Sequence, residues 1–137
     1  MLSKKLFWIF MVAILLISLA GCVGLKTAQL EITFDPNPVP CENEHLSWKT
    51  IISEINGVGV TLETIVQDVY VGDEKVASHT YDEVWMEEWL GSSYIPAFSS
   101  MTITAGCGCM VTHEIFTVNG IDNNGHEVQA TGRVDAL

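Results

Sequence analysis

The sequence predicts an all-β fold, an antiparallel sandwich of about seven strands with one short helical insertion. Several short segments alternate apolar and polar residues, which is the period of a half-buried strand. Turn signals rich in Gly, Asn and Pro separate these segments. Only one segment of the folded part has helical spacing, so the chain has too few helices for an α/β fold. A sandwich accounts for this pattern best.

The first half of the expected sandwich contains four strands. Leu30–Phe34 alternates, and the prolines of residues 35–40 end it, because proline cannot donate to a sheet ladder. A second strand ends at Asn56-Gly57, a third follows, and a short strand around Val76 comes after a turn at residues 72–74. The residues expected to point inward from the second and third strands are Leu46, Trp48, Ile52, Val60, Leu62 and Val66.

The period then changes to that of a helix. Thr80-Tyr81-Asp82-Glu83 fits a capping box, in which Thr80 and Glu83 satisfy free amides at a helix start. Gly91 is placed where a helix would end. The expected apolar face consists of Trp85, Met86, Trp89 and Leu90.

The second half continues as strands. Residues 101–104 form one expected strand, and Cys107-Gly108-Cys109 makes a tight connection to another at residues 111–121. Asp122-Asn123-Asn124-Gly125 predicts a hairpin turn, because Asn and Gly tolerate positive φ. Residues 128–134 alternate along the last strand.

Residues 1–21 have the pattern of a secretory signal peptide. Lys4 and Lys5 form a basic start, and Leu6–Leu19 follows without a charge. The last four residues of this region, Leu19-Ala20-Gly21-Cys22, resemble the lipobox of prokaryotic lipoproteins. That resemblance implies cleavage before Cys22 and attachment of lipid to its sulfur. The alternative is an ordinary signal peptide with a chance cysteine.

The expected organisation is thus a helical signal peptide at 1–21, a lipidated tether at 22–28 and a sandwich domain at 29–137. Several acyl chains on one residue anchor a protein stably. The protein is expected to be extracytoplasmic and held on the cell membrane. Val23 is not the aspartate that the resemblance associates with inner-membrane retention, so an outer membrane is the expected location where the cell has one.

Residues 22–137 are strongly acidic. Two of the six basic residues lie in the signal peptide, so the mature part has 4 basic against 17 acidic residues, a formal charge of −13. Such a surface repels nucleic acid, and nucleic-acid binding is excluded on this ground. Solubility and repulsion from the membrane explain the acidity; binding of a cation or a basic partner is the alternative.

The folded part resembles bacterial immunoglobulin-like and fibronectin-III-like domains. The resemblance rests on Phe34–Val39, on Trp48 in the second strand and on the run from Phe116 through the 122–125 turn to Val134. It implies a binding, spacing or display module and transfers no catalytic residue. The role expected for this chain is that of a non-enzymatic envelope binding or structural module, whose partner is an envelope protein or another ligand.

Cys41, Cys107 and Cys109 are left once Cys22 carries lipid. In a sandwich, the connections that hold Cys41 and the 107–109 turn return to the same end, so a disulfide from Cys41 to Cys107 or Cys109 is expected, with Cys109 preferred. Closing a loop of more than sixty residues would stabilise the fold by about 4 kcal/mol. A bridge between Cys107 and Cys109 is the alternative.

A soft-metal site is the competing functional hypothesis. Cys107, Cys109, Met110 and His113 offer thiolate, thioether and imidazole ligands, which suit copper in its reduced state. The simpler interpretation is a disulfide, a buried methionine and a surface histidine, in which case no cofactor is needed.

The remaining candidates are aromatic. Trp48 is expected in the core, and Trp85 and Trp89 are expected either to cover the sandwich edge or to anchor a partner. No nucleophile elbow, phosphate-binding glycine loop or His-Glu-x-x-His pattern occurs, so the protein is not expected to be an enzyme.

Overall fold

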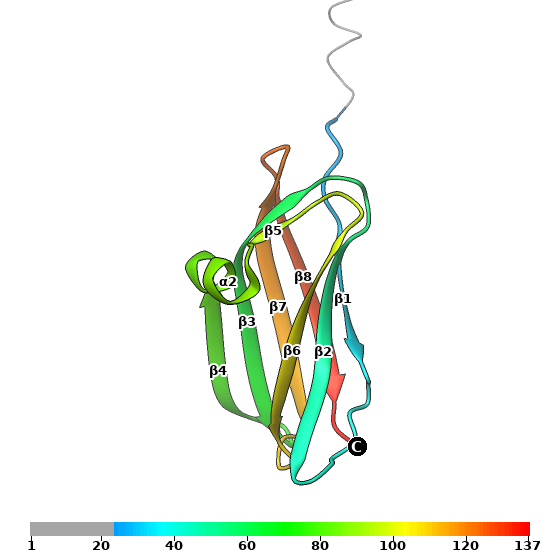
Figure 1. The fold of residues 1–137 in the computed structure, drawn as a ribbon, viewed down its shortest axis with the longest axis vertical. Helices are drawn as coiled ribbons and strands as arrows, with labels where there is room; N and C mark the ends of the chain where they lie inside the picture. Colours follow the sequence, from blue (N-terminus) through cyan, green and yellow to red (C-terminus); the bar gives the residue numbers. More distant parts are fainter. Residues whose placement is uncertain (1–23) are drawn as a thin grey trace, which may run out of the picture.

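The computed structural model describes residues 24–137. The expected signal peptide and Cys22 lie outside the described residues. Within these described residues, eight strands and one helix follow one another, and Figure 1 shows how they are arranged. They are β1 (Leu30–Asp35), β2 (His45–Glu54), β3 (Val60–Val71), β4 (Glu74–Asp82), α2 (Glu83–Leu90), β5 (Tyr94–Ile95), β6 (Ser100–Gly108), β7 (His113–Asp122) and β8 (Glu127–Asp135).

The strands form two antiparallel sheets that face each other, which confirms the predicted sandwich. One sheet has the order β1-β2-β6, and the other has the order β4-β3-β7-β8 with the two-residue β5 paired to β3. Strands β6 and β4 are end strands of their sheets. Helix α2 connects β4 to β5 and lies at the end of β4, next to β3 (Figure 1).

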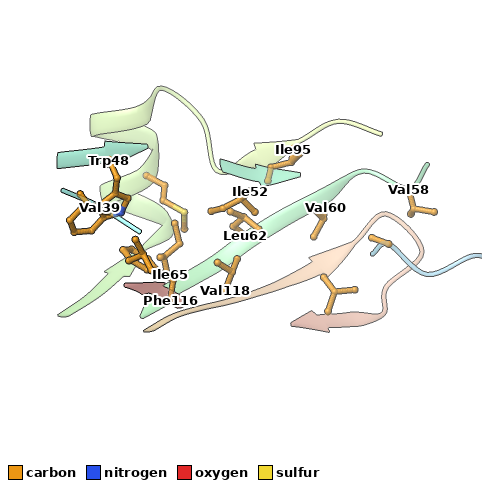
Figure 2. Packing of buried hydrophobic residues seen from close by; sticks show 14 of the residues in the cluster. Val39, Trp48, Ile52, Val58, Val60, Leu62, Ile65, Ile95, Phe116 and Val118 are labelled. Carbon is orange, nitrogen blue, oxygen red and sulfur yellow. The ribbon is translucent and has the colours of Figure 1, made fainter. Parts of the chain in front are cut away.

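The core lies between the sheets. Figure 2 shows side chains from both sheets packing together, and Trp48 is among them, as expected. The alternation in β7 is regular, with Phe116 and Val118 buried. Burial of such side chains is the main favourable term for folding.

The prediction for β3 was wrong at Val66. The pairing of β3 with β7 shifts between Leu62 and Thr64, so that Glu63 is an extra residue. Side chains alternate in a strand, so one extra residue exchanges the two faces. Ile65 is therefore buried in place of Val66.

The start of the helix also differs from the prediction. Thr80 lies in β4 opposite Val66, and Asp82 caps α2 by accepting a hydrogen bond from the Trp85 backbone N–H (2.9 Å). Aspartate at this position satisfies one of the free amides of the first turn. The end is as predicted, with Gly91 in the left-handed conformation at φ 81°.

The sandwich has two ends that matter below. The N-terminal pole consists of residues 24–29 and the loops 55–59, 96–99 and 123–126. The far pole consists of the loops 36–44, 72–73 and 109–112 and the C-terminus (Figure 1). Of the helices in residues 24–137, none has the length and apolar character needed to cross a membrane.

Candidate functional site

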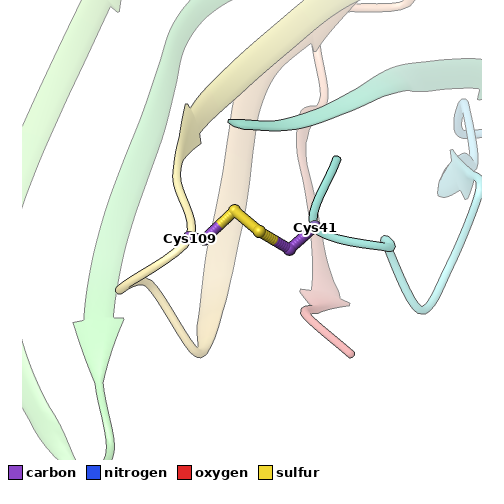
Figure 3. The surroundings of a disulfide bond; sticks show 2 residues. All are labelled: Cys41 and Cys109. Carbon is purple, nitrogen blue, oxygen red and sulfur yellow. A yellow bond between two sulfur atoms is a disulfide. The ribbon is translucent and has the colours of Figure 1, made fainter. Parts of the chain in front are cut away.

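A disulfide joins Cys41 to Cys109 at the far pole (Figure 3). Cys41 belongs to the β1–β2 connection and Cys109 directly follows β6, and their Cα atoms are 5.7 Å apart. The two connections lie at the same end of the sandwich, as predicted, and the preferred pairing of Cys41 with Cys109 is confirmed. The covalent link closes the far pole across 68 residues of sequence.

Cys107 is the free cysteine among residues 24–137. Its side chain is half-buried and packs against the core from β6. Burial, together with the nearby Glu114 carboxylate, raises the pKa of the Cys107 thiol to about 12. The thiol is therefore protonated at neutral pH, and a protonated thiol is a poor nucleophile and a poor metal ligand.

Glu114 is a buried carboxylate in the interior of the sandwich. It is 1% exposed, and its Oε2 accepts a hydrogen bond from Gln67 Nε2 (2.6 Å). Its Oε1 accepts no hydrogen bond from any residue of the 24–137 segment. Gln67 Oε1 in turn accepts a hydrogen bond from the Tyr81 hydroxyl (2.8 Å). A polar row, Glu114–Gln67–Tyr81, thus runs from the interior to the β4 edge.

The row reaches an open cleft between the two end strands. This edge cleft has a volume of about 240 Å³ and lies between β6 on one side and β3, β4 and α2 on the other. Phe116 contributes to its floor, and Tyr81 and Trp85 form an aromatic wall with ring centroids 4.4 Å apart. The residues that line it are Ile65, Gln67, Tyr81, Trp85, Ile103, Thr104, Ala105, Gly106 and Phe116.

The two candidate tryptophans have different surroundings. Trp85 is half-buried and lines the edge cleft, whereas Trp89 is 70% exposed. The helix buries Met86 instead, so the interpretation in which Trp89 covers the sandwich edge was wrong. Of the two, Trp85 is the one that lines the cleft, and its role as an anchor for a partner stays a prediction.

The four candidate copper ligands do not form one group in the described residues. Cys109 is bound to Cys41, and the Met110 side chain is exposed. The His113 ring stacks on Tyr70, with centroids 4.6 Å apart. Within residues 24–137, no three His, Cys, Asp or Glu side chains are placed to hold one metal ion.

At the N-terminal pole, Glu54 organises the loops. Its carboxylate is 1% exposed and accepts hydrogen bonds from the backbone N–H groups of Gln29, Asn56, Gly57 and Phe98, at 2.8–3.2 Å. Burial alone would raise the pKa of Glu54, but the four amides outweigh it and lower the pKa to about 2. One ionised side chain therefore joins three segments of the pole.

Asp122 does the same for the neighbouring hairpin. Its Oδ1 accepts the backbone N–H groups of Asn124 and His126, and its Oδ2 accepts that of Ala28, all at 2.9 Å. His126 Nδ1 lies 3.2 Å from Oδ2. Burial opposes ionisation here too, but these donors lower the pKa of Asp122 to about 2.

Part of the expected tether is fixed by the same pole. The side chain of Asn124 donates to the Lys26 carbonyl (2.7 Å), and that of Asn56 donates to the Thr27 carbonyl (2.8 Å). With Ala28 bound to Asp122, residues 26–28 are attached to the sandwich.

The sequence reasoning missed Glu114, Gln67, Tyr81, Glu54 and Asp122. A signal existed for Glu114, because it lies on the same strand face as Phe116 and Val118. A carboxylate at an inward strand position is unusual unless it is paired. Nothing local distinguishes Glu54, whose four donors come from three separate segments.

Comparison with known proteins shows the fold alone. No protein-family model matches the sequence, and a search of curated proteins finds no relative. A solved structure, the putative ApaA protein from Bordetella pertussis, superposes with a TM-score of 0.54 at 14% identity, covering 82% of this chain and 97% of that one. The fold is immunoglobulin-like. A CARDB domain from Pyrococcus furiosus, solved in complex with di-metal ions, is also similar, with a TM-score of 0.41 and 13% identity over 83% of this chain and 97% of that one.

Proposed function

We propose that this protein is a lipid-anchored, extracytoplasmic binding module that takes an extended segment of a partner protein at the edge cleft. Lipid on Cys22 holds it on the membrane, which is the outer membrane where the cell has one. The proposal assigns no catalytic step and no cofactor. Its partner is an envelope protein.

The unprotected β6 edge beside the cleft carries this proposal. An end strand presents unpaired backbone groups, and proteins normally guard such strands with charges or proline. Strand β6 has the sequence SMTITAGCG, which contains neither. Its exposed Thr102 and Thr104 are β-branched residues that suit strand pairing. An added strand would place alternate side chains in the cleft, which gives both affinity and selectivity.

The chemistry of the cleft favours a segment with basic residues. Tyr81 and Trp85 offer aromatic faces on which a cation can lie. Asp82, Glu83 and Glu88 are exposed acidic residues at the adjacent start and middle of α2. Copper handling receives no comparable support, because Cys109 is in the disulfide and the Cys107 pKa is raised.

Site-specific photo-crosslinking tests the proposal. A photoreactive residue replaces Thr104 at the β6 edge, or Thr131 on β8 as a matched control, in the full chain in its native membrane. Thr104 should give one defined crosslinked product. Trp85→Ala should remove that product, whereas Trp89→Ala, which leaves the cleft lining intact, should preserve most of it.

Two results would contradict the proposal. Equal products from positions 104 and 131 would mean that the β6 edge has no special partner. A product with twice the mass of this chain would mean that β6 pairs with a second copy of itself.

A further inference from the structure

The N-terminal pole exposes large apolar side chains at three places. Leu25 is 66% exposed, Ile55 is 44% exposed and Phe98 is 74% exposed. They come from the segment that enters the sandwich and from two of the pole's three loops. Exposed apolar groups that gather on one surface mark a contact with a partner or a membrane.

Phe98 is held in its exposed position by the loops beneath it. Its φ is 55°, in the left-handed region that bulky residues avoid. Its backbone N–H donates to the buried Glu54 Oε2 (3.0 Å). Its ring lies over Gly57, where an added Cβ would come within 2.6 Å of a ring carbon. The pole therefore fixes a phenylalanine toward solvent, at a cost in backbone energy.

The same pole lacks the acidic charge that dominates the rest of the chain. Its four segments, residues 24–29, 55–59, 96–99 and 123–126, contain no Asp or Glu. Three carboxylates directly adjoin these segments in sequence: Glu54 and Asp122 are buried and bound by backbone amides, and Glu127 is exposed at the start of β8. At the far pole, by contrast, the loops carry Glu42, Glu44 and Asp73. In a domain with 17 acidic residues, the N-terminal pole therefore meets an anionic headgroup layer with less repulsion than the far pole does.

The length of chain before this pole limits how far it can stand from a membrane. Lys26 is already bound to Asn124, so three residues separate it from Cys22. Four residue steps span at most about 14 Å when fully extended. An acylated Cys22 therefore keeps Leu25 and the adjacent loops close to the headgroups.

We infer that the N-terminal pole docks on the lipid bilayer, with Leu25, Ile55 and Phe98 inserted in the interface. This inference rests on the lipid anchor of the proposed function. It gives the module a fixed orientation, in which the far pole and the disulfide point away from the membrane. The edge cleft then opens to the side, parallel to the membrane surface.

The test measures alkylation of a reporter cysteine on vesicles. The full lipidated chain, added to the outside of preformed phosphatidylcholine vesicles, carries Ala97→Cys beside Phe98 or Asp73→Cys at the far pole. A membrane-impermeant maleimide should modify position 97 roughly tenfold more slowly than position 73, the population shift expected for transfer of one or two apolar side chains. Cys107 gives little background because its pKa is raised to about 12.

The matched variant is Ile55→Ser/Phe98→Ser in the Ala97→Cys background. It should react at position 97 almost as fast as the far-pole reporter, with unchanged folding, because both replaced side chains are exposed. Equal rates at 97 and 73 in a chain that floats with the vesicles would overturn the docking and leave the anchor intact. A chain that does not float with the vesicles would overturn both the docking and the lipid anchor. Protection of position 97 that grows with protein density would assign the pole to a second copy instead.

Discussion

The two poles of the sandwich are closed by different chemistry. At the far pole, one covalent bond joins Cys41 to Cys109. At the N-terminal pole, two buried carboxylates, Glu54 and Asp122, gather seven backbone N–H groups from separate segments. The first closure is sensitive to reductant and the second to acid, so the two poles can be loosened independently.

This difference in closure explains how firmly each pole fixes the residues on its surface. A disulfide holds a connection in place without fixing the residues around it, whereas four amides on one carboxylate fix several loop residues at once. That is why Phe98 can be held outward in a strained conformation at the N-terminal pole. The pole next to the expected membrane is thus the one with the more closely specified surface.

The largest effect is expected from opening the far pole. Cys41→Ser should lower the free energy of unfolding by about 4 kcal/mol, because the unfolded chain gains the entropy of an open loop. Chemical denaturation at neutral pH measures it. The native chain in reductant should show the same loss, and Cys107→Ala should leave reductant sensitivity unchanged. If reductant left the stability of the native chain unchanged, this would contradict the conclusion that a disulfide closes the far pole.

Glu54→Gln should have the next largest effect. The amide cannot accept from four donors as a carboxylate does, and each buried N–H left without a partner costs about 1–3 kcal/mol. Denaturation should show the loss, and hydrogen exchange should show that Gly57 and Phe98 amides lose protection first. Cys41→Ser provides the control, because it should loosen the far pole and leave these amides protected.

Acid should loosen the N-terminal pole selectively. Folding lowers the pKa of Glu54 from 4.5, and that of Asp122 from 3.8, to about 2. At pH values between the unfolded and folded pKa, the unfolded state therefore binds more protons than the folded state does. The contribution of the two carboxylates to stability is complete above about pH 5 and is lost as the pH falls toward 2. Glu54→Gln/Asp122→Asn should be less stable at neutral pH and show a shallower acid decline. An unchanged decline would assign acid sensitivity to other groups.

Much of the fold followed from alternation and turn residues. Trp48, Leu62 and Gly91 lie as their local patterns predicted, because strand period and helix caps are local properties. Val66 and Thr80 do not, because a bulge at Glu63 and the extension of β4 depend on pairing with distant strands. The disulfide could be predicted from topology, because the two chain connections that contain its cysteines lie at the same end of a sandwich.

The candidate site was much less accessible from sequence. The edge cleft exists because β4 and β6 are end strands of opposite sheets, a property of strand order that no local pattern encodes. The role of Glu54 depends on Phe98, 44 residues away. The expected lipid anchor, in contrast, rests on a local motif at residues 19–22 and stays a prediction, because these residues lie outside the described part.

The smallest effect on stability, and the sharpest contrast, is expected at Glu114. It is as buried as Glu54, but a single Gln67 amide binds it and its Oε1 has no partner among residues 24–137. Glu114→Gln removes an incompletely compensated carboxylate, so stability should change by less than about 1 kcal/mol.

The same substitution should lower the Cys107 pKa but leave it above its usual value, because burial, the main cause of the raised pKa, remains. Alkylation of Cys107 as a function of pH measures that shift. A loss of stability as large as that of Glu54→Gln would mean that Glu114 stabilises the interior as Glu54 stabilises the N-terminal pole. An unchanged pKa of the Cys107 thiol would mean that the Glu114 carboxylate does not act on it.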